Sequence, residues 1–189
     1  MNFNRELNDT AMIYLENFKR ILERMIEEMT GAKLCDSISY NFIIQMIPHH
    51  EAAIEMSKNI LKYTDNPVLI RIAQGIIEEQ TKSIANMEKI LNCCREVENC
   101  DRDICEHQEK INEIMDIMFY SMENARAVNN LDCNFIWEMI PHHRGAVEMS
   151  ENTLMYCICE ELKPILTAII SSQKRGIIQM QRLSRCIGC

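Results

Sequence analysis

MIPHHEAAIEMS, residues 46–57, returns as MIPHHRGAVEMS at residues 139–150, and this repeated stretch decides the fold. It is part of a longer match, because residues 41–91 align without a gap on residues 134–184, with roughly two in five positions identical. Self-similarity at one fixed spacing indicates a duplication. The sequence therefore predicts a single domain over residues 1–189, with repeat one at 6–92, a cysteine-rich connector at 93–101 and repeat two at 102–189.

Three helices are predicted in each repeat, because apolar residues recur at spacings of three and four. The pattern covers residues 6–30, 37–63 and 67–91 in repeat one, and residues 102–127, 131–156 and 160–185 in repeat two. Pro67 suits the first position of a helix, and the short turn before it makes the second and third helices antiparallel neighbours. One helix pair leaves an apolar stripe exposed, so we expect an all-α fold in which the two copies close into a four-helix bundle. The first helix of each copy then packs outside the bundle or across one of its ends, which gives about six helices.

Composition excludes several classes of partner. The chain of 189 residues has a net charge of −8 and no run of Lys and Arg, so neither nucleic acid nor an anionic membrane surface is expected to bind. No segment approaches the roughly 18 apolar residues of a membrane span. Charges at Arg5, Glu6 and Asp9 interrupt the region where a secretory signal needs an apolar core. We therefore expect a cytoplasmic protein whose partner is a metal ion, and a homo-oligomer is not excluded.

The paired histidines stand where an apolar helix seam is expected. His49 lies 16 residues before Asp65 and Gln80 lies 15 residues after it. At the rise of a helix both are about 23 Å from the turn, so they lie at the same level. Pro48 lacks the N–H that would bond the Ile44 carbonyl. We expect this carbonyl to accept a ring N–H and so to orient an imidazole, as second-shell groups do at metal sites.

Methionines flank these histidines in both copies. Thioether and imidazole together favour Cu(I), a soft ion that takes few ligands, whereas hard ions need carboxylates and zinc rarely takes Met. The sequence predicts such a site in each repeat, with ligands drawn from His49, His50, Met46, Met87, His142, His143, Met139 and Met180. The residues expected to support these ligands, or to bind more weakly, are Gln80, Gln173, Met56, Met149, Met25, Met29, Met118 and Met122. The other interpretation is a polar cluster that only specifies packing, with His49 bonded to Gln80 and His50 bonded to a carbonyl.

Three motifs carry a resemblance to a known family. MIPHHEAAIEMS, the turn YTDNPVL at residues 63–69 and IIEEQTKSIANM at residues 76–87 resemble the bacterial family named domain of unknown function 305 (DUF305). The resemblance covers nearly the whole chain in two tandem copies and implies a ferritin-like four-helix fold marked by a His-His pair. The family includes exported copper-binding proteins, so the resemblance also implies metal binding at the His, Met and Gln positions above, with copper as the metal. The chain departs from the family in showing no export signal and in its cysteines.

Ten cysteines form a second candidate site. Reduced thiols bind soft metals, zinc among them, whereas oxidised thiols form disulfides. The cysteines expected at the end of the bundle away from the two tight turns are Cys35, Cys94, Cys100, Cys105, Cys133 and Cys189. Cys157 and Cys159 lie in a turn and are expected at the opposite end.

No catalytic activity is expected. A di-iron oxidase needs Glu on four helices and Glu-x-x-His pairs, whereas here Glu138 stands four residues before His142 and Gln45 replaces it in repeat one. His107 takes the position of Tyr14 and is expected at the surface or at an end of the bundle. The alternative function is that of a structural or assembly protein, for example at a cell or spore surface, whose cysteines cross-link and whose His pairs only specify packing.

Overall fold

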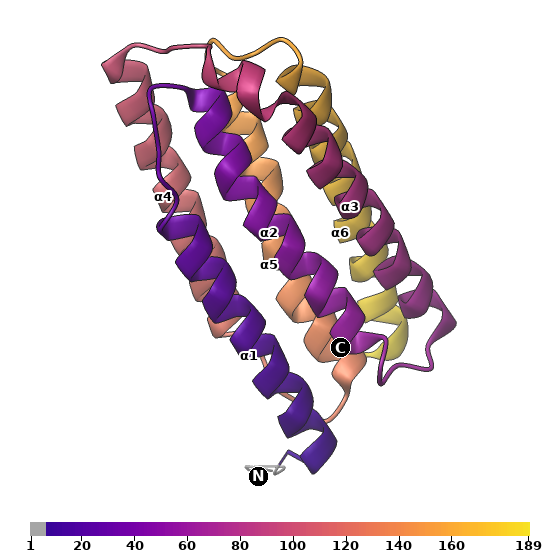
Figure 1. Ribbon diagram of the computed structural model, residues 1–189. Helices are drawn as coiled ribbons and strands as arrows, with labels where there is room; N and C mark the ends of the chain where they lie inside the picture. Colours follow the sequence, from indigo (N-terminus) through magenta and orange to yellow (C-terminus); the bar gives the residue numbers. More distant parts are fainter. Residues whose placement is uncertain (1–6) are drawn as a thin grey trace.

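The structure, a computed structural model, describes residues 7–189, which form six α-helices and no strand (Figure 1). The helices are α1 (Asp9–Thr30), α2 (Ile38–Ile60), α3 (Pro67–Arg95), α4 (Asp101–Glu123), α5 (Leu131–Thr153) and α6 (Leu162–Ile187). The all-α prediction is confirmed, and the helix ends differ from the predicted ones by a few residues. Residue 6, the predicted start of the first helix and of repeat one, lies outside the described residues.

Local capping residues set the helix boundaries. The Asn66 side chain accepts hydrogen bonds from the backbone N–H groups of Val68 (3.0 Å) and Leu69 (3.4 Å), with Pro67 as the first residue of α3. Ser37 and Asn130 cap α2 and α5 in the same way. Because these signals are short-range, the sequence predicts the helix starts well.

The six helices form three adjacent pairs. α2 and α5 pack on each other in the middle, α1 and α4 lie on one side of them, and α3 and α6 pack together on the other side (Figure 1). The four-helix bundle of α2, α3, α5 and α6 therefore has α1 and α4 outside it, as the sequence predicts. α2 and α5 are the central helices, which explains why so many of their residues are buried.

The two halves of the chain run antiparallel to each other. The backbone N–H of Cys159, in the turn before α6, donates to the Ser39 hydroxyl at the start of α2 (2.9 Å). At the other end of the molecule, the backbone N–H of Asn8 before α1 donates to the Asn129 side chain before α5 (2.8 Å). The turn between α2 and α3 and the turn between α5 and α6 therefore lie at opposite ends of the bundle.

This arrangement corrects the predicted placement of the cysteines. Cys159 is predicted at the end of the bundle opposite to Cys94, but its thiol lies close to those of Cys93 and Cys94. Cys133 and Cys189, at the far end, form a disulfide. The prediction fails because the turn between α5 and α6 packs beside the end of α3 rather than beside the turn between α2 and α3.

A single hydrophobic cluster joins all six helices. It contains every methionine named as a candidate ligand or as a supporting residue, each at most 2% exposed. None of the helices in residues 7–189 is long and apolar enough to cross a membrane. The division into two repeats and a connector stays a prediction.

Candidate functional site

His49 and His142 meet where α2 and α5 cross. Their ring centroids are 3.7 Å apart, with an angle of 31° between the ring planes, and both side chains are 0% exposed. The Nε2 atom of His49 lies 3.2 Å from the carbonyl oxygen of His142, and the Nε2 atom of His142 lies 3.1 Å from the carbonyl oxygen of His49. The seam histidines of the two repeats are therefore in direct contact at the centre of the molecule.

These reciprocal hydrogen bonds fix the tautomer of both rings. A carbonyl oxygen only accepts, so each Nε2 carries the proton and each Nδ1 keeps a free lone pair. Both Nδ1 atoms are buried and have no hydrogen-bond partner. The predicted role of the Ile44 carbonyl is wrong, because the orienting acceptor is the carbonyl of the opposite histidine. The alternative bond from His49 to Gln80 is not formed either.

The second histidine of each pair flanks this centre. His50 and His143 lie 5.8 and 5.9 Å from their neighbouring rings, and each has a buried Nδ1 without a partner. The Nε2 atom of His50 is 3.1 Å from the Ser83 hydroxyl. Gly176 takes the place of Ser83 in repeat two, and a Cβ there would come within 2.9 Å of the His143 ring. Among the described residues, no hydrogen bond reaches the Nε2 atom of His143.

Two glutamines leave further polar atoms unpaired nearby. Both side-chain amide atoms of Gln80, and the amide oxygen of Gln173, are buried without a hydrogen-bond partner. Buried polar groups are normally paired with protein atoms, ordered water or an ion, so these unpaired atoms mark a candidate binding position. Gln80, Gln173 and His50 line one cavity between α3 and α6, which connects the glutamine positions to the histidines.

Burial keeps all four histidines neutral. Desolvation lowers the pKa of His50 to about 3 and that of His142 to about 4. It also lowers the pKa values of His49 and His143 well below the ordinary value, with a smaller contribution from the neighbouring imidazoles. A neutral imidazole is the form that binds a metal. At neutral pH the four rings are therefore ready to act as ligands without losing a proton.

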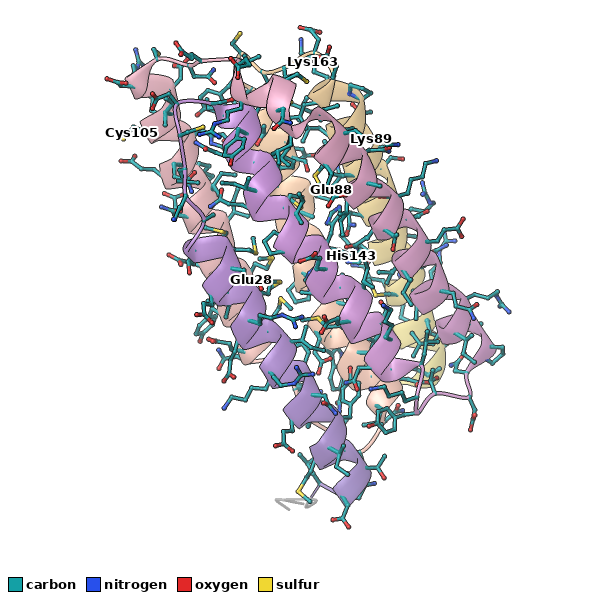
Figure 2. The ribbon with its side chains drawn as sticks, viewed as in Figure 1. Glu28, Glu88, Lys89, Cys105, His143 and Lys163 are labelled. Atoms are coloured by element: carbon teal, nitrogen blue, oxygen red, sulfur yellow. A yellow bond between two sulfur atoms is a disulfide. The ribbon has the colours of Figure 1, made fainter. Side chains whose placement is uncertain are left out.

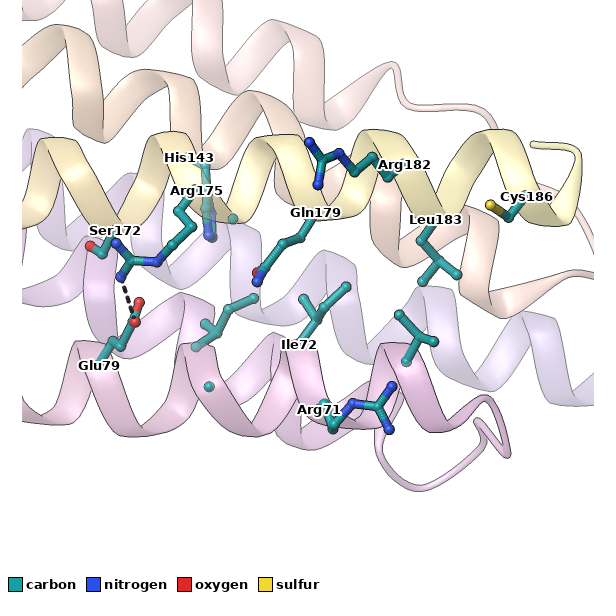
Figure 3. A pocket seen from close by; sticks show the side chains of 14 residues that line it. Arg71, Ile72, Glu79, His143, Ser172, Arg175, Gln179, Arg182, Leu183 and Cys186 are labelled. Carbon is teal, nitrogen blue, oxygen red and sulfur yellow. Dashed lines mark hydrogen bonds and ion pairs between the residues drawn. The ribbon is translucent and has the colours of Figure 1, made fainter.

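Two cavities in the groove between α3 and α6 approach the histidines from outside. One has a volume of about 500 Å³ and is lined by His143, Gly75 and Gly176 among others (Figure 3). The other, of about 530 Å³, is lined by His50. An ion pair between Arg175 and Glu79 (2.8 Å), with both side chains about half exposed, lies between them. The groove gives solvent a short path to the outer histidine of each pair.

The outer helices reach the central pair of helices close to the histidines. A Cβ at Gly145 would overlap the sulfur of Met118, which comes from α4. Gly145 is two residues from His143, so the Met118 sulfur lies within one turn of the pair. The candidate methionines are buried in the same core, but burial alone does not identify a ligand.

A group of cysteine thiols also offers possible metal ligands, and the sequence predicts it only in part. Among residues 7–189, only one group of three or more His, Cys, Asp or Glu residues has all its donor atoms within 4.8 Å of one another. This group consists of Cys93, Cys94 and Cys159. The four imidazoles do not meet that criterion together. Any metal centre in the histidine layer therefore needs methionine sulfur or a small number of nitrogen ligands.

Glu138 is a buried acid whose burial the sequence does not reveal. The hydroxyl of Tyr14 donates to the Glu138 carboxylate over 2.6 Å, and burial raises the pKa of Glu138 to about 8. His107 is 1% exposed and lies 3.0 Å from the hydroxyl of Thr153, the last residue of α5. Of the two places predicted for His107, the surface is therefore wrong, whereas a position toward an end of the bundle agrees with this contact. One signal in the sequence could have indicated the bond between Tyr14 and Glu138, because both residues are replaced in the other repeat.

The family described as domain of unknown function (DUF305) matches residues 39–184 once, across both repeats. The solved structure of CopM in the Ag-bound form is 28% identical, with a TM-score of 0.58 over 78% of this chain and 94% of that chain. CopM in the apo form is 27% identical, with the same TM-score over 78% and 96%. A DUF305 fragment from Deinococcus radiodurans is 19% identical, with a TM-score of 0.55 over 77% and 94%, and supports the fold alone. No curated protein matches the chain.

Proposed function

Because the chain belongs to the DUF305 family, we propose that it binds a soft metal ion, Cu(I) in particular, for sequestration or tolerance. The observation that carries the proposal is the histidine layer. It holds four buried imidazoles whose Nδ1 atoms have no hydrogen-bond partner, inside a core that also holds the candidate methionines. Similarity to CopM, which has been solved in an Ag-bound form, supports metal binding in general.

Ligand chemistry selects the metal. Ag(I), named for the similar structure, is a soft ion, and soft ions favour sulfur and nitrogen donors. The unpaired Nδ1 atoms of His49 and His142 are donors of this kind, and burial keeps them unprotonated. Cu(I) accepts few ligands, so it does not need all four imidazoles to converge. We therefore favour Cu(I) over zinc or a hard divalent ion in this layer.

The proposed ligands come from both halves of the chain. His49 and His142 are already in contact, so we propose one shared centre in place of two independent ones. His50 and His143 would receive the ion from the groove between α3 and α6, whose cavities they line. The proposed sulfur ligands are Met46, Met87, Met139 and Met180. Gln80, Gln173, Met56, Met149, Met25, Met29, Met118 and Met122 are proposed to support them.

Cu(I) titration tests the histidine layer. Purified reduced protein, without oxygen, is titrated with Cu(I) against a competing chelator, and the bound equivalents are counted. In the variant His49→Ala/His142→Ala we expect the loss of at least one equivalent. His107→Ala is the matched control, because that imidazole is equally buried but bonded to Thr153 and far from the layer in sequence. Equal stoichiometry in wild type and the double variant, both folded by circular dichroism, would contradict the proposal.

Methionine variants separate ligation from packing. Met→Leu substitution conserves volume and costs little stability in a core, but it removes the thioether. We expect Met46→Leu/Met139→Leu to lower Cu(I) affinity by about tenfold or more, on the scale seen for groups that support metal ligands. Met155→Leu, 82% exposed, is the control and should leave the affinity unchanged. Unchanged affinity in the double variant would exclude Met46 and Met139 as ligands.

The rival function is an assembly protein joined by disulfides. Five free cysteines are exposed, at Cys93, Cys100, Cys105, Cys157 and Cys186, so cross-linking surfaces exist. This rival predicts disulfide-linked multimers on a non-reducing gel and no bound metal. We further propose that the chain has no catalytic activity, no nucleic-acid partner and a cytoplasmic location. An assay of the fractionated cell tests the last of these directly.

A further inference from the structure

Three cysteine thiols gather at one end of the bundle, away from the histidine layer. Cys93 and Cys94 are in the last turn of α3, and Cys159 is in the turn before α6, 66 residues after Cys93. Their sulfur atoms all lie within 4.8 Å of one another, and the sulfurs of Cys93 and Cys159 are 4.0 Å apart. The cluster joins two halves of the chain that no local sequence pattern brings together.

The backbone around the thiols is held in place by α2. The Ser37 hydroxyl donates to the Cys94 carbonyl (2.7 Å), and the Cys159 N–H donates to the Ser39 hydroxyl (2.9 Å). The Asn99 side chain, which accepts from the Ile38 N–H, also donates to the Cys157 carbonyl (2.7 Å). Both thiol-bearing segments are thus bonded to the start of the same helix. Ligands held by such bonds lose little freedom when an ion binds.

The burial of the three thiols differs in a way that suits an ion. Cys94 is 0% exposed and Cys159 is 4% exposed, whereas Cys93 is exposed. The Cys159 thiol donates to the Glu161 carboxylate (3.0 Å), and the Cys93 thiol donates to the Ile90 carbonyl (3.1 Å). An ion can enter from the Cys93 side and be covered by the core on the other side. Glu161 adds an oxygen close to the sulfurs.

We propose that Cys93, Cys94 and Cys159 form a second soft-metal site, which binds Cu(I) through three sulfurs. Thiolates are soft ligands, and three of them satisfy an ion of low coordination number without help from a fourth group. Each thiol releases its proton to solvent as it binds, and the ion keeps its oxidation state. The site does not depend on the histidine layer, so either one can fail without the other.

The opposite end of the bundle gives an internal comparison. In the alignment of the repeats, Cys93 corresponds to Cys186, but Cys94 corresponds to Ile187 and Cys159 corresponds to Asn66. Only one of the three sulfurs is therefore present at that end, and the nearby Cys133 and Cys189 are joined in a disulfide. The three-thiol cluster is confined to one end of the chain.

The test counts Cu(I) equivalents in cysteine variants of the full chain, reduced and without oxygen. We expect Cys93→Ser/Cys94→Ser/Cys159→Ser to lose one equivalent that His49→Ala/His142→Ala retains. The matched control removes three thiols outside the cluster, in Cys35→Ser/Cys100→Ser/Cys105→Ser, and should keep every equivalent. Cys105 lies on the outer side of α4 (Figure 2).

A single exposed variant guards against a folding defect. Cys93→Ser changes a solvent-exposed side chain, so the protein should fold, and the affinity of the cysteine-dependent equivalent should fall at least about tenfold. Copper X-ray absorption should show sulfur neighbours that are lost in the triple variant. If the triple variant and the control bind the same number of equivalents, or if Zn(II) binds at this cluster more tightly than Cu(I), the proposal is overturned.

Discussion

Replacing Glu138 by Gln should stabilise the protein increasingly as the pH rises. Glu138 is 1% exposed, and among residues 7–189 its carboxylate is hydrogen-bonded only to the Tyr14 hydroxyl, so burial favours the neutral form of the carboxyl group. Burial raises its pKa from 4.5 to about 8. In repeat one the matching position holds an amide, Gln45, which is 2% exposed.

The magnitude follows from the two pKa values. Because the pKa of Glu138 is higher in the native state than in the unfolded state, protonation of Glu138 stabilises the native state. This contribution to the free energy of unfolding is fully present below pH 4.5 and is lost as the pH rises toward 8. Within that window the unfolded carboxyl is ionised and the native one is not, so wild type loses about 1.4 kcal/mol for each pH unit. The glutamine side chain does not ionise in this pH range. Between pH 5 and pH 7 the stability of Glu138→Gln relative to wild type should therefore rise by about 2.7 kcal/mol.

Urea unfolding followed by circular dichroism at pH 5, 6 and 7 measures this difference. Glu148→Gln is the control, because Glu148 is on the exposed side of the same helix, and its difference from wild type should change by well under about 1 kcal/mol. A difference for Glu138→Gln that stays constant with pH, or shrinks as the pH rises, would refute the reasoning. It would mean that the native carboxyl ionises like an exposed one.

Two further predictions concern the histidine layer. The metal-free protein should lose stability as the pH falls below about 6.5, because burial lowers the pKa of each buried histidine and only the unfolded rings then take up protons. Each such histidine should lower the free energy of unfolding by about 1.4 kcal/mol per pH unit. Acid titration followed by circular dichroism measures the sum. Gly75→Ala should stabilise the protein by up to about 1 kcal/mol, because a Cβ there meets nothing within 4 Å. Gly176→Ala should destabilise it by about 1–3 kcal/mol, because the new Cβ would push against the His143 ring. Thermal unfolding of the two variants measures both effects, and equal effects would contradict the geometry.

The parts of the fold that depend on short-range signals were predictable from the sequence. Helix starts at Pro67 and after Asn130 follow from capping chemistry that involves only neighbouring residues. The burial of His49 follows from its place on an apolar seam. In contrast, the relative direction of the two halves depends on how whole helix faces fit together, which no local pattern encodes. The position of Cys159 beside Cys94 was therefore predicted wrongly.

The same limit applies to the candidate site. The sequence identifies the imidazoles, but not that the His49 ring uses the His142 carbonyl, because that contact joins residues 93 positions apart. The Tyr14 to Glu138 bond is hidden for the same reason, with 124 positions between its partners. Each of these residues draws its environment from the other half of the chain.

The antiparallel crossing separates the chemistry at the centre of the bundle from the chemistry at its ends. Where two copies of one helix cross antiparallel at their midpoints, a residue meets its own counterpart, as His49 meets His142. Toward the ends a residue meets a different part of the other copy, as Cys94 meets Cys159, whose counterpart is Asn66. Substitution in one repeat is then enough to create a new contact, so thiol chemistry can arise at one end without disturbing the histidines at the centre.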